Sequence, residues 1–206
     1  VAAGLRVPKT SSRAITSPSG TADTMEVLAP VSIPVARLER MLDKVGGFIV
    51  WGGAINLAPA DDRIINVEHP LSIDAEGQML ASIMAKKASV GATHLLMDLP
   101  VGAGSKLRDM REAMHLERQF ARLGRLLGIK VVTMITDGRE PIGNGIGPSL
   151  EARDCLWVLE DDVRAPQDLR RKSVELAAGL LEMTGKAKAG EGFGLAEGLL
   201  RDGSAL

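Results

Sequence analysis

Aromatic residues are scarce in this sequence, and cysteine is almost absent. The 206 residues include two tryptophans, three phenylalanines and no tyrosine, so a core must be built mainly from Leu, Ile, Val, Met and Ala. Few aromatic side chains argue against a single-stranded nucleic-acid surface, which stacks bases on them. The net charge of −1 also provides no basic field for a nucleic-acid polymer.

The single cysteine, Cys155, excludes an internal disulfide and a cysteine-rich metal site. It lies in the apolar run Cys-Leu-Trp-Val at 155–158, which favours a buried structural thiol over a nucleophile. No apolar run is long enough to cross a membrane. From these features we expect a cytoplasmic protein with no membrane partner.

Apolar segments of strand length alternate along the chain with amphipathic segments of helix length. The pattern predicts strands at 5–8, 48–51, 93–99 and 130–135. It predicts helices at 21–27, 31–45, 60–66, 75–90, 107–127, 149–159, 166–183 and 190–200. Thr21 and Ser149 should cap the helices that begin with them. This alternation indicates an α/β fold with a mostly parallel sheet flanked by helices.

A hydroxyl-rich loop separates the first predicted strand from the first predicted helix. It runs from Ser11 to Gly20, and Pro18 interrupts regular structure within it. Backbone N–H groups at a helix start, together with hydroxyl donors, can bind an anion, and Arg13 can balance its charge. An ordinary capped helix start has the same composition, so the pattern alone leaves both interpretations open. Asp23 and Arg13 could likewise bind a ligand or brace the loop.

The strings Ser-Ser-Arg-Ala-Ile and Ser-Gly-Thr-Ala-Asp-Thr-Met-Glu within 11–26 resemble the phosphate-binding motif of the thymidine/pyrimidine-nucleoside phosphorylase family. The related loop of anthranilate phosphoribosyltransferase, which shares the fold, is also similar. The segments Leu-Ala-Pro-Ala-Asp at 57–61 and Ala-Ser-Ile-Met-Ala-Lys-Lys at 81–87 resemble the phosphorylases alone. They are most similar to the branch of archaeal AMP phosphorylases and bacterial thymidine phosphorylases. The resemblance covers nearly the whole chain.

This resemblance implies that residues 1–206 form a central α/β fragment of the nucleoside phosphorylase and phosphoribosyltransferase type. A helical segment at about 59–90 would contribute to the base site. The amino-terminal helical domain and the carboxy-terminal domain of the family would be absent, so the fragment by itself should be inactive. The intact protein would be a homodimer.

The reaction that the resemblance implies is phosphorolysis of a nucleoside, which yields a free base and a (deoxy)ribose 1-phosphate. Ser11 and Thr21 match the hydroxyls that hold inorganic phosphate in the family. Arg13 and Asp23 are further candidates for the phosphate site. No organic cofactor would be needed.

Ser82 and Lys86 match the serine and lysine that hold the base carbonyls in pyrimidine phosphorylases. Lys86 would also stabilise negative charge on the departing base. Their four-residue spacing places both side chains on one face of a helix. Without the resemblance, a solvated lysine on an ordinary helix would be the simpler interpretation.

The chain departs from the family at Val67, where the resemblance places a base-holding arginine. Valine cannot donate a hydrogen bond to a base carbonyl, so pyrimidine specificity does not follow from this position. Arg63 lies one helical turn earlier and could replace the missing donor. A nucleoside 5′-monophosphate such as AMP is therefore the alternative substrate.

Two other segments could hold ions. Glu151 follows a glycine-rich loop at 141–147 and matches a carboxylate that binds a monovalent cation in some relatives; compensation of the helix dipole is the alternative. A phosphoribosyltransferase would need Mg²⁺ on an acidic pair, and the candidates are the clusters at 160–162 and at Asp61-Asp62; surface charge at a helix end or start is the alternative. A non-catalytic phosphate-binding module is a third possibility. The loop at 101–106 lacks the full phosphate-loop spacing, which favours a tight strand-to-helix turn.

Overall fold

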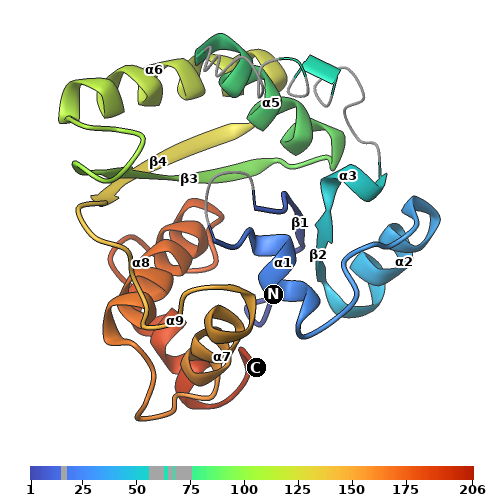
Figure 1. Ribbon diagram of the computed structural model, residues 1–206, viewed down its shortest axis with the longest axis vertical. Coiled ribbons are helices and arrows are strands. Elements are labelled where there is room, and N and C mark those ends of the chain that lie inside the picture. The colour runs from blue at the N-terminus through green and yellow to red at the C-terminus, as the bar shows by residue number, and fades with distance from the viewer. Residues whose placement is uncertain (15–17, 56–62, 65–66, 68–75) are drawn as a thin grey trace. The chain divides into compact units, whose positions relative to one another are not determined.

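The computed structural model describes residues 1–14, 18–55, 63–64, 67 and 76–206 (Figure 1). The chain divides into two compact units: unit 1 comprises Val1–Ile55 and Pro141–Leu206, and unit 2 comprises Asn56–Glu140. Within the described residues, each unit contains one two-stranded parallel sheet with helices around it. The predicted α/β class and the parallel strand pairing are therefore confirmed.

Unit 1 is built on strands β1 (Val7–Ser11) and β2 (Gly47–Trp51), which pair so that Thr10 lies beside Val50. Both of these residues are buried, so this is the covered face of the strand pair. The helices of the unit are α1 (Thr21–Glu26), α2 (Val35–Val45), α3 (Gly52–Ile55), α7 (Pro148–Leu159), α8 (Gln167–Met183) and α9 (Gly192–Arg201).

The three last helices of unit 1 share an apolar core. In α8, Val174, Ala178 and Leu181 recur at helical spacing and are buried against α9. Small side chains such as Ala178 and Ala196 let these helices approach closely. The buried cluster consists of Val158, Ala165, Val174, Leu181, Ala196 and Leu200.

Unit 2 contains strands β3 (His94–Val101) and β4 (Lys130–Asp137), which pair over eight residues. Helices α5 (Glu76–Ser89) and α6 (Met110–Leu127) pack on this pair. Helix α6 has a conventional start, because the Asp109 carboxylate accepts hydrogen bonds from the N–H groups of Arg111 and Glu112. Gly128, at φ 70°, ends it.

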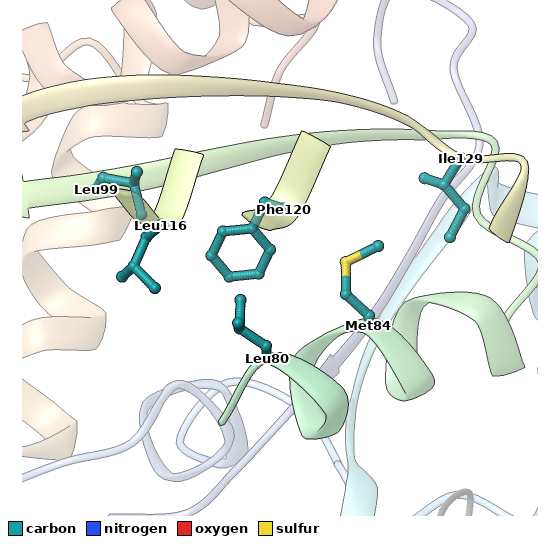
Figure 2. Close-up of a cluster of buried hydrophobic side chains, with 6 residues drawn as sticks. All are labelled: Leu80, Met84, Leu99, Leu116, Phe120 and Ile129. Carbon is teal, nitrogen blue, oxygen red and sulfur yellow. The ribbon is translucent and has the colours of Figure 1, made fainter. Parts of the chain in front are cut away.

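The core of unit 2 lies between α5, α6 and the strands (Figure 2). Phe120 is 1% exposed, and Leu80 and Met84 of α5 point toward it from the facing helix. Leu99 of β3 and Ile129 complete the cluster with Leu116. The expectation of a core made mainly of aliphatic side chains and Met is confirmed here, with a single aromatic ring at its centre.

The predicted helix caps are wrong. Gly20, not Thr21, is the N-cap of α1, and Gly147, not Ser149, is the N-cap of α7. Gly147 has φ 94° and ψ 162°, a backbone conformation that side chains disfavour, and Pro148 then sets the first helical φ. In both cases a glycine whose backbone conformation fits the helix start occupies the N-cap, and the predicted hydroxyl side chain does not cap the helix.

Some predicted element ends are also wrong. The first strand runs to Ser11, which is therefore the last strand residue and not the first loop residue. Helix α2 begins four residues later than predicted, after Pro34. Helix α6 begins at Met110 because residues 102–107 form a tight turn, in which Gly102 N–H donates to the Leu107 carbonyl at 2.9 Å. This turn confirms the interpretation of the 101–106 loop.

The predicted helix at 60–66 lies largely outside the described residues. Residues 63, 64 and 67 are helical, and α5 confirms the predicted helix at 75–90 with ends shifted by one residue. Of the helices in the described part of the chain, none is long and apolar enough to cross a membrane.

Candidate functional site

Ser11 and Thr21 lie on either side of the hydroxyl-rich loop in unit 1. Ser11 ends β1 and is half-buried, whereas Thr21 is exposed at the first position of α1. The loop is closed beneath them by a backbone hydrogen bond from Ala22 N–H to the Ser12 carbonyl at 3.2 Å. Within the described residues, neither hydroxyl takes part in a hydrogen bond. Both therefore remain suited to donate to a bound anion.

Gly20 closes this loop by direct contact with the backbone opposite. A Cβ atom at Gly20 would lie 2.5 Å from the Arg13 carbonyl carbon and 2.6 Å from the Ser12 oxygen. The backbone atoms of 12–14 would have to move to make room. Gly20 is thus required by close approach, since its φ of −101° is accessible to any residue.

We expect Gly20→Ala to destabilise unit 1 by about 1–3 kcal/mol, the usual cost of inserting a methyl group into a closely packed position. The measurement is chemical denaturation of the purified chain. Gly198→Ala on α9 is the matched control, because a Cβ there meets nothing within 4 Å. An alanine at that helical position should be neutral or stabilising. Equal destabilisation by both variants would contradict the close-approach argument.

Asp23 braces the loop from the first turn of α1. Its Oδ2 accepts hydrogen bonds from Ala14 N–H at 2.7 Å and Gly20 N–H at 3.0 Å. These backbone hydrogen bonds, and then the Arg13 guanidinium, hold the pKa of Asp23 below its ordinary value. The carboxylate therefore stays ionised and ties both sides of the loop to the helix.

Arg13 is neutralised within the same loop. Its guanidinium contacts Asp23 at 2.9 Å and Glu26 at 2.6 and 2.9 Å, and it lies over the Trp51 ring at 4.7 Å. Hydrogen bonds to Glu26 and then to Asp23 raise the pKa of Arg13. These contacts are those of a loop brace. A direct role of Arg13 or Asp23 in binding phosphate stays a prediction.

Glu151 reaches from α7 to α1. Its Oε2 accepts a hydrogen bond from the Thr24 hydroxyl at 3.0 Å, and its Oε1 accepts one from Gly147 N–H at 3.0 Å. The Thr24 hydroxyl also contacts the Ser19 hydroxyl at 2.8 Å. The carboxylate therefore does more than compensate the helix dipole, because it connects helix α1 with the glycine-rich loop before α7.

The glycine-rich loop before α7 is held by three carboxylates in all. Besides the bond to Glu151, Asp154 accepts from Asn144 N–H at 2.8 Å and Gly145 N–H at 2.7 Å, and Asp168 accepts from Gly143 N–H at 3.1 Å. Asp154 is only 1% exposed. These N–H groups therefore point toward protein carboxylates, so they are not free to cradle a phosphate.

The guanidinium group of Arg153 contacts both the buried carboxylate of Asp154 and the ring of Trp157. The Arg153 guanidinium donates to Asp154 at 2.8 Å and lies over the Trp157 ring at 4.4 Å. Burial of Asp154 raises its pKa. Hydrogen bonds from Arg153 and from the loop backbone lower the pKa by a larger amount, so the net shift is downward. Sequence analysis missed Asp154, because its partners are backbone groups about ten residues away.

In unit 2, Ser82 and Lys86 face each other on α5. The Lys86 ammonium donates to the Ser82 hydroxyl at 3.2 Å, and both residues are half-buried. The predicted sharing of one helix face is confirmed. Arg63 and Val67 are both exposed, with Val67 61% exposed, so neither is committed to a core.

A cavity of about 860 Å³ lies within unit 2, beside the carboxyl end of β3. Its floor is apolar and includes the core residues Leu99, Leu116 and Phe120. Its rim carries a hydrogen bond between the His115 ring and the Glu76 carboxyl group, at 2.8 Å. Carboxyl ends of parallel strands commonly bind ligands, but Ser82 and Lys86 are not among the residues that line this cavity. No local pattern in the sequence indicates the contact between His115 and Glu76, because the two residues are 39 positions apart.

The acidic cluster at 160–162 is paired with arginines. Asp161 contacts Arg170 at 2.9 Å and Asp162 contacts Arg164 at 2.6 Å. Across the described ranges, no group of three or more His, Cys, Asp or Glu side chains is placed to hold a metal ion. Asp61 and Asp62, the other acidic pair, lie outside the described residues.

Comparison with known proteins gives one consistent result. No family model matches the chain. Over 204 residues, 99% of the chain, it is 54% identical to "Putative thymidine phosphorylase 2" and 53% identical to "Putative thymidine phosphorylase 1", both of Acidovorax sp. (strain JS42). It is 54% identical over 203 residues to "Putative thymidine phosphorylase" of Rhodopseudomonas palustris (strain BisB18). The resemblance to the thymidine phosphorylase family is confirmed.

The chain spans about 40% of the length of these relatives. Its assigned residues fall in both units: Ser11 and Thr21 in unit 1, Ser82 and Lys86 in unit 2. In unit 2 Ser82 and Lys86 are in direct contact, and in unit 1 a backbone hydrogen bond joins Ser12 and Ala22, the residues that follow Ser11 and Thr21.

Proposed function

We propose that this chain serves a phosphorylase that cleaves the N-glycosidic bond of a nucleoside with inorganic phosphate. A phosphate oxygen attacks C1′, the bond from C1′ to the base nitrogen breaks, and the base takes up the proton released by phosphate. The products are a free base and a sugar 1-phosphate, and no organic cofactor is consumed. The 53–54% identity to proteins named thymidine phosphorylases is the observation that carries this proposal.

Unit 1 supplies the phosphate-binding residues in this proposal. The hydroxyls of Ser11 and Thr21 donate to phosphate, and the brace formed by Arg13, Asp23 and Glu26 keeps the loop in place. Because the positive charge of Arg13 is cancelled within the loop, phosphate meets mainly neutral donors there. Neutral donors position the nucleophile and withdraw less charge from it than a cation would.

Unit 2 supplies the base-binding residues. Ser82 and Lys86 present a hydroxyl and an ammonium group side by side on α5, which suits two acceptor atoms on a planar base. Lys86 also stabilises the negative charge that develops on the base as it leaves. We assign thymidine or another pyrimidine nucleoside as the substrate. A nucleoside 5′-monophosphate is the second candidate, because Val67 lacks the donor group that a pyrimidine carbonyl would need.

The direct experiment is to measure base release by the complete gene product from thymidine, uridine, AMP and CMP, with and without phosphate. Phosphate-dependent release from thymidine or uridine would support the pyrimidine assignment. Release from the monophosphates alone would move the protein to the second candidate. An enzyme that releases no base from any of the four, with phosphate present, would contradict the proposed function.

Single substitutions in unit 1 test the phosphate residues. Ser11→Ala and Thr21→Val should each raise the KM for phosphate by about 10-fold, the effect of losing one hydrogen bond to a charged ligand. The KM for the nucleoside should stay within twofold of the wild-type value. Ser173→Ala, an exposed serine on α8 of the same unit, is the control and should change neither constant. Unchanged phosphate KM in both variants would remove Ser11 and Thr21 from the site.

A further inference from the structure

The carboxylate of Glu151 makes contacts that neither dipole compensation nor cation binding requires. We propose that Glu151 is a positioning residue, which holds the start of α1 in place through Thr24 and so orients the phosphate loop. This inference rests on the proposed function, since it assigns a role toward the same phosphate. It differs from the resemblance, which points to a monovalent cation at this carboxylate.

The hydrogen-bond direction is fixed by chemistry. A carboxylate can only accept, so the Thr24 hydroxyl must donate its single hydrogen to Glu151. The 2.8 Å contact with Ser19 can then be a hydrogen bond only if Ser19 donates and Thr24 accepts. The Ser19 hydroxyl also lies 3.2 Å from the Gly20 carbonyl, a second acceptor, but the contact with Thr24 is the shorter one, so Ser19 donates to Thr24 and Thr24 donates to Glu151. This chain of hydrogen bonds draws the end of the loop toward α7.

The second oxygen of Glu151 fixes the carboxylate itself. Gly147 N–H donates to Oε1 at 3.0 Å, at the point where the glycine backbone has a φ of 94°. Thr24 and Glu151 are 127 positions apart in the sequence, so this single side chain joins two distant segments of unit 1. Helix α1 packs against α7 around this contact.

The position of Thr24 explains why this contact matters for phosphate. Thr24 lies one residue after Asp23 and three residues after Thr21, so it belongs to the same short helix as both. A six-residue helix has little stability of its own and depends on tertiary contacts. Fixing Thr24 therefore fixes the rotation of α1, and with it the direction of the Thr21 hydroxyl.

Glutamine at position 151 separates the two explanations. Its side-chain oxygen can accept from Gly147 N–H, and its amide can donate to Thr24, whose own hydrogen then turns to Ser19. Glu151→Gln therefore keeps both contacts and loses only the charge. A cation held at this position would lose the attraction of that charge, so its binding should weaken in the same variant.

The first readout is steady-state kinetics of the complete gene product. Glu151→Ala and Thr24→Val should each raise the phosphate KM about 10-fold with little change in the nucleoside KM, as expected for one lost charged hydrogen bond. The effects of the two substitutions should be less than additive in the double variant, because both remove the Thr24–Glu151 hydrogen bond. Glu151→Gln should recover to within threefold of wild type. Glu175→Gln on α8 is the control carboxylate and should have no effect.

The second readout does not depend on activity. Amide hydrogen exchange at 19–24 should accelerate in Glu151→Ala and Thr24→Val, and stay near wild type in Glu151→Gln. If the wild-type protein shows no phosphorolysis, the proposed function fails, and the exchange rates still decide whether the brace exists. The positioning role would be overturned in favour of a cation site if Glu151→Gln raised the phosphate KM as much as Glu151→Ala and if its activity no longer depended on K⁺. Unchanged exchange at 19–24 in Glu151→Ala would overturn it as well.

Discussion

Replacing Lys86 by alanine should lower kcat for phosphorolysis by about 100- to 1,000-fold, the usual loss when one preorganised electrostatic group is removed. The ammonium group sits half-buried on α5 and donates to Ser82 at 3.2 Å, so its direction is already set before a base binds. Negative charge on the base is larger in the transition state than in the bound nucleoside. In the proposed mechanism Lys86 would therefore contribute more to the rate than to binding of the ground state, and the KM for the nucleoside should change much less than kcat.

The chemistry of the leaving group gives this prediction a specific signature. A base whose N–H is more acidic, such as 5-fluorouracil, leaves with less need for stabilisation. The loss caused by Lys86→Ala should therefore be smaller with 5-fluorouridine than with uridine. Lys87→Ala is the matched control, since it removes the same charge from the next position of α5. A loss that is equal for both bases, or that appears only in KM, would contradict leaving-group stabilisation.

The sequence predicted those parts of the molecule that depend on local periodicity. The alternation of strand-length and helix-length segments gave the α/β class, and α5 begins and ends within one residue of its prediction. The Ser82–Lys86 contact also follows from local spacing, because four residues are about one helical turn. In these cases the geometry of one element decides the outcome, and the element can be recognised from its own residues.

Contacts between distant segments could not be predicted in this way. The bond from Thr24 to Glu151 joins residues 127 positions apart, and a hydroxyl in a helix gives no sign of its partner. The caps show the same limit, because Gly20 is selected by the backbone of 12–14 opposite it. Arg13 was recognised as a cation near the loop, yet its partner Glu26 and the Trp51 ring become apparent only in three dimensions.

Asp154 is the residue in unit 1 whose loss should destabilise the fold most. Asp154→Ala leaves the N–H groups of Asn144 and Gly145 and the Arg153 guanidinium without their buried acceptor. Breaking a buried charged contact from one side typically costs about 3–5 kcal/mol of unfolding free energy. Chemical denaturation of the purified chain measures this directly. The result matters for function because the same loop holds Gly147, the partner of Glu151.

Two further variants show whether the stabilisation by Asp154 depends on the charge or on the shape of its side chain. Asp154→Asn keeps one oxygen for the two loop N–H groups but turns an NH₂ group toward Arg153, so it should cost about 1–3 kcal/mol. Asp168→Asn is the control: Asp168 is exposed and accepts from the N–H groups of Gly143 and Leu169, so about 1 kcal/mol or less is expected. Equal costs for the Asp154→Asn and Asp168→Asn variants would show that burial of the carboxylate is unimportant.

The free energy of unfolding should depend on pH in a direction that follows from the pKa of Asp154. The pKa of Asp154 is lower in the folded protein than its ordinary value, so the folded state favours the ionised carboxylate. Its stabilisation is fully present above the ordinary aspartate pKa of about 4, and is lost as the pH falls below that value toward the folded pKa. Other carboxylates with lowered pKa values, such as Asp23 and Glu197, titrate in the wild type and in the variant alike. The difference in unfolding free energy between wild type and Asp154→Asn should therefore become smaller below about pH 4. If the difference became larger there, the effect of burial on the pKa of Asp154 would outweigh the effect of its hydrogen bonds.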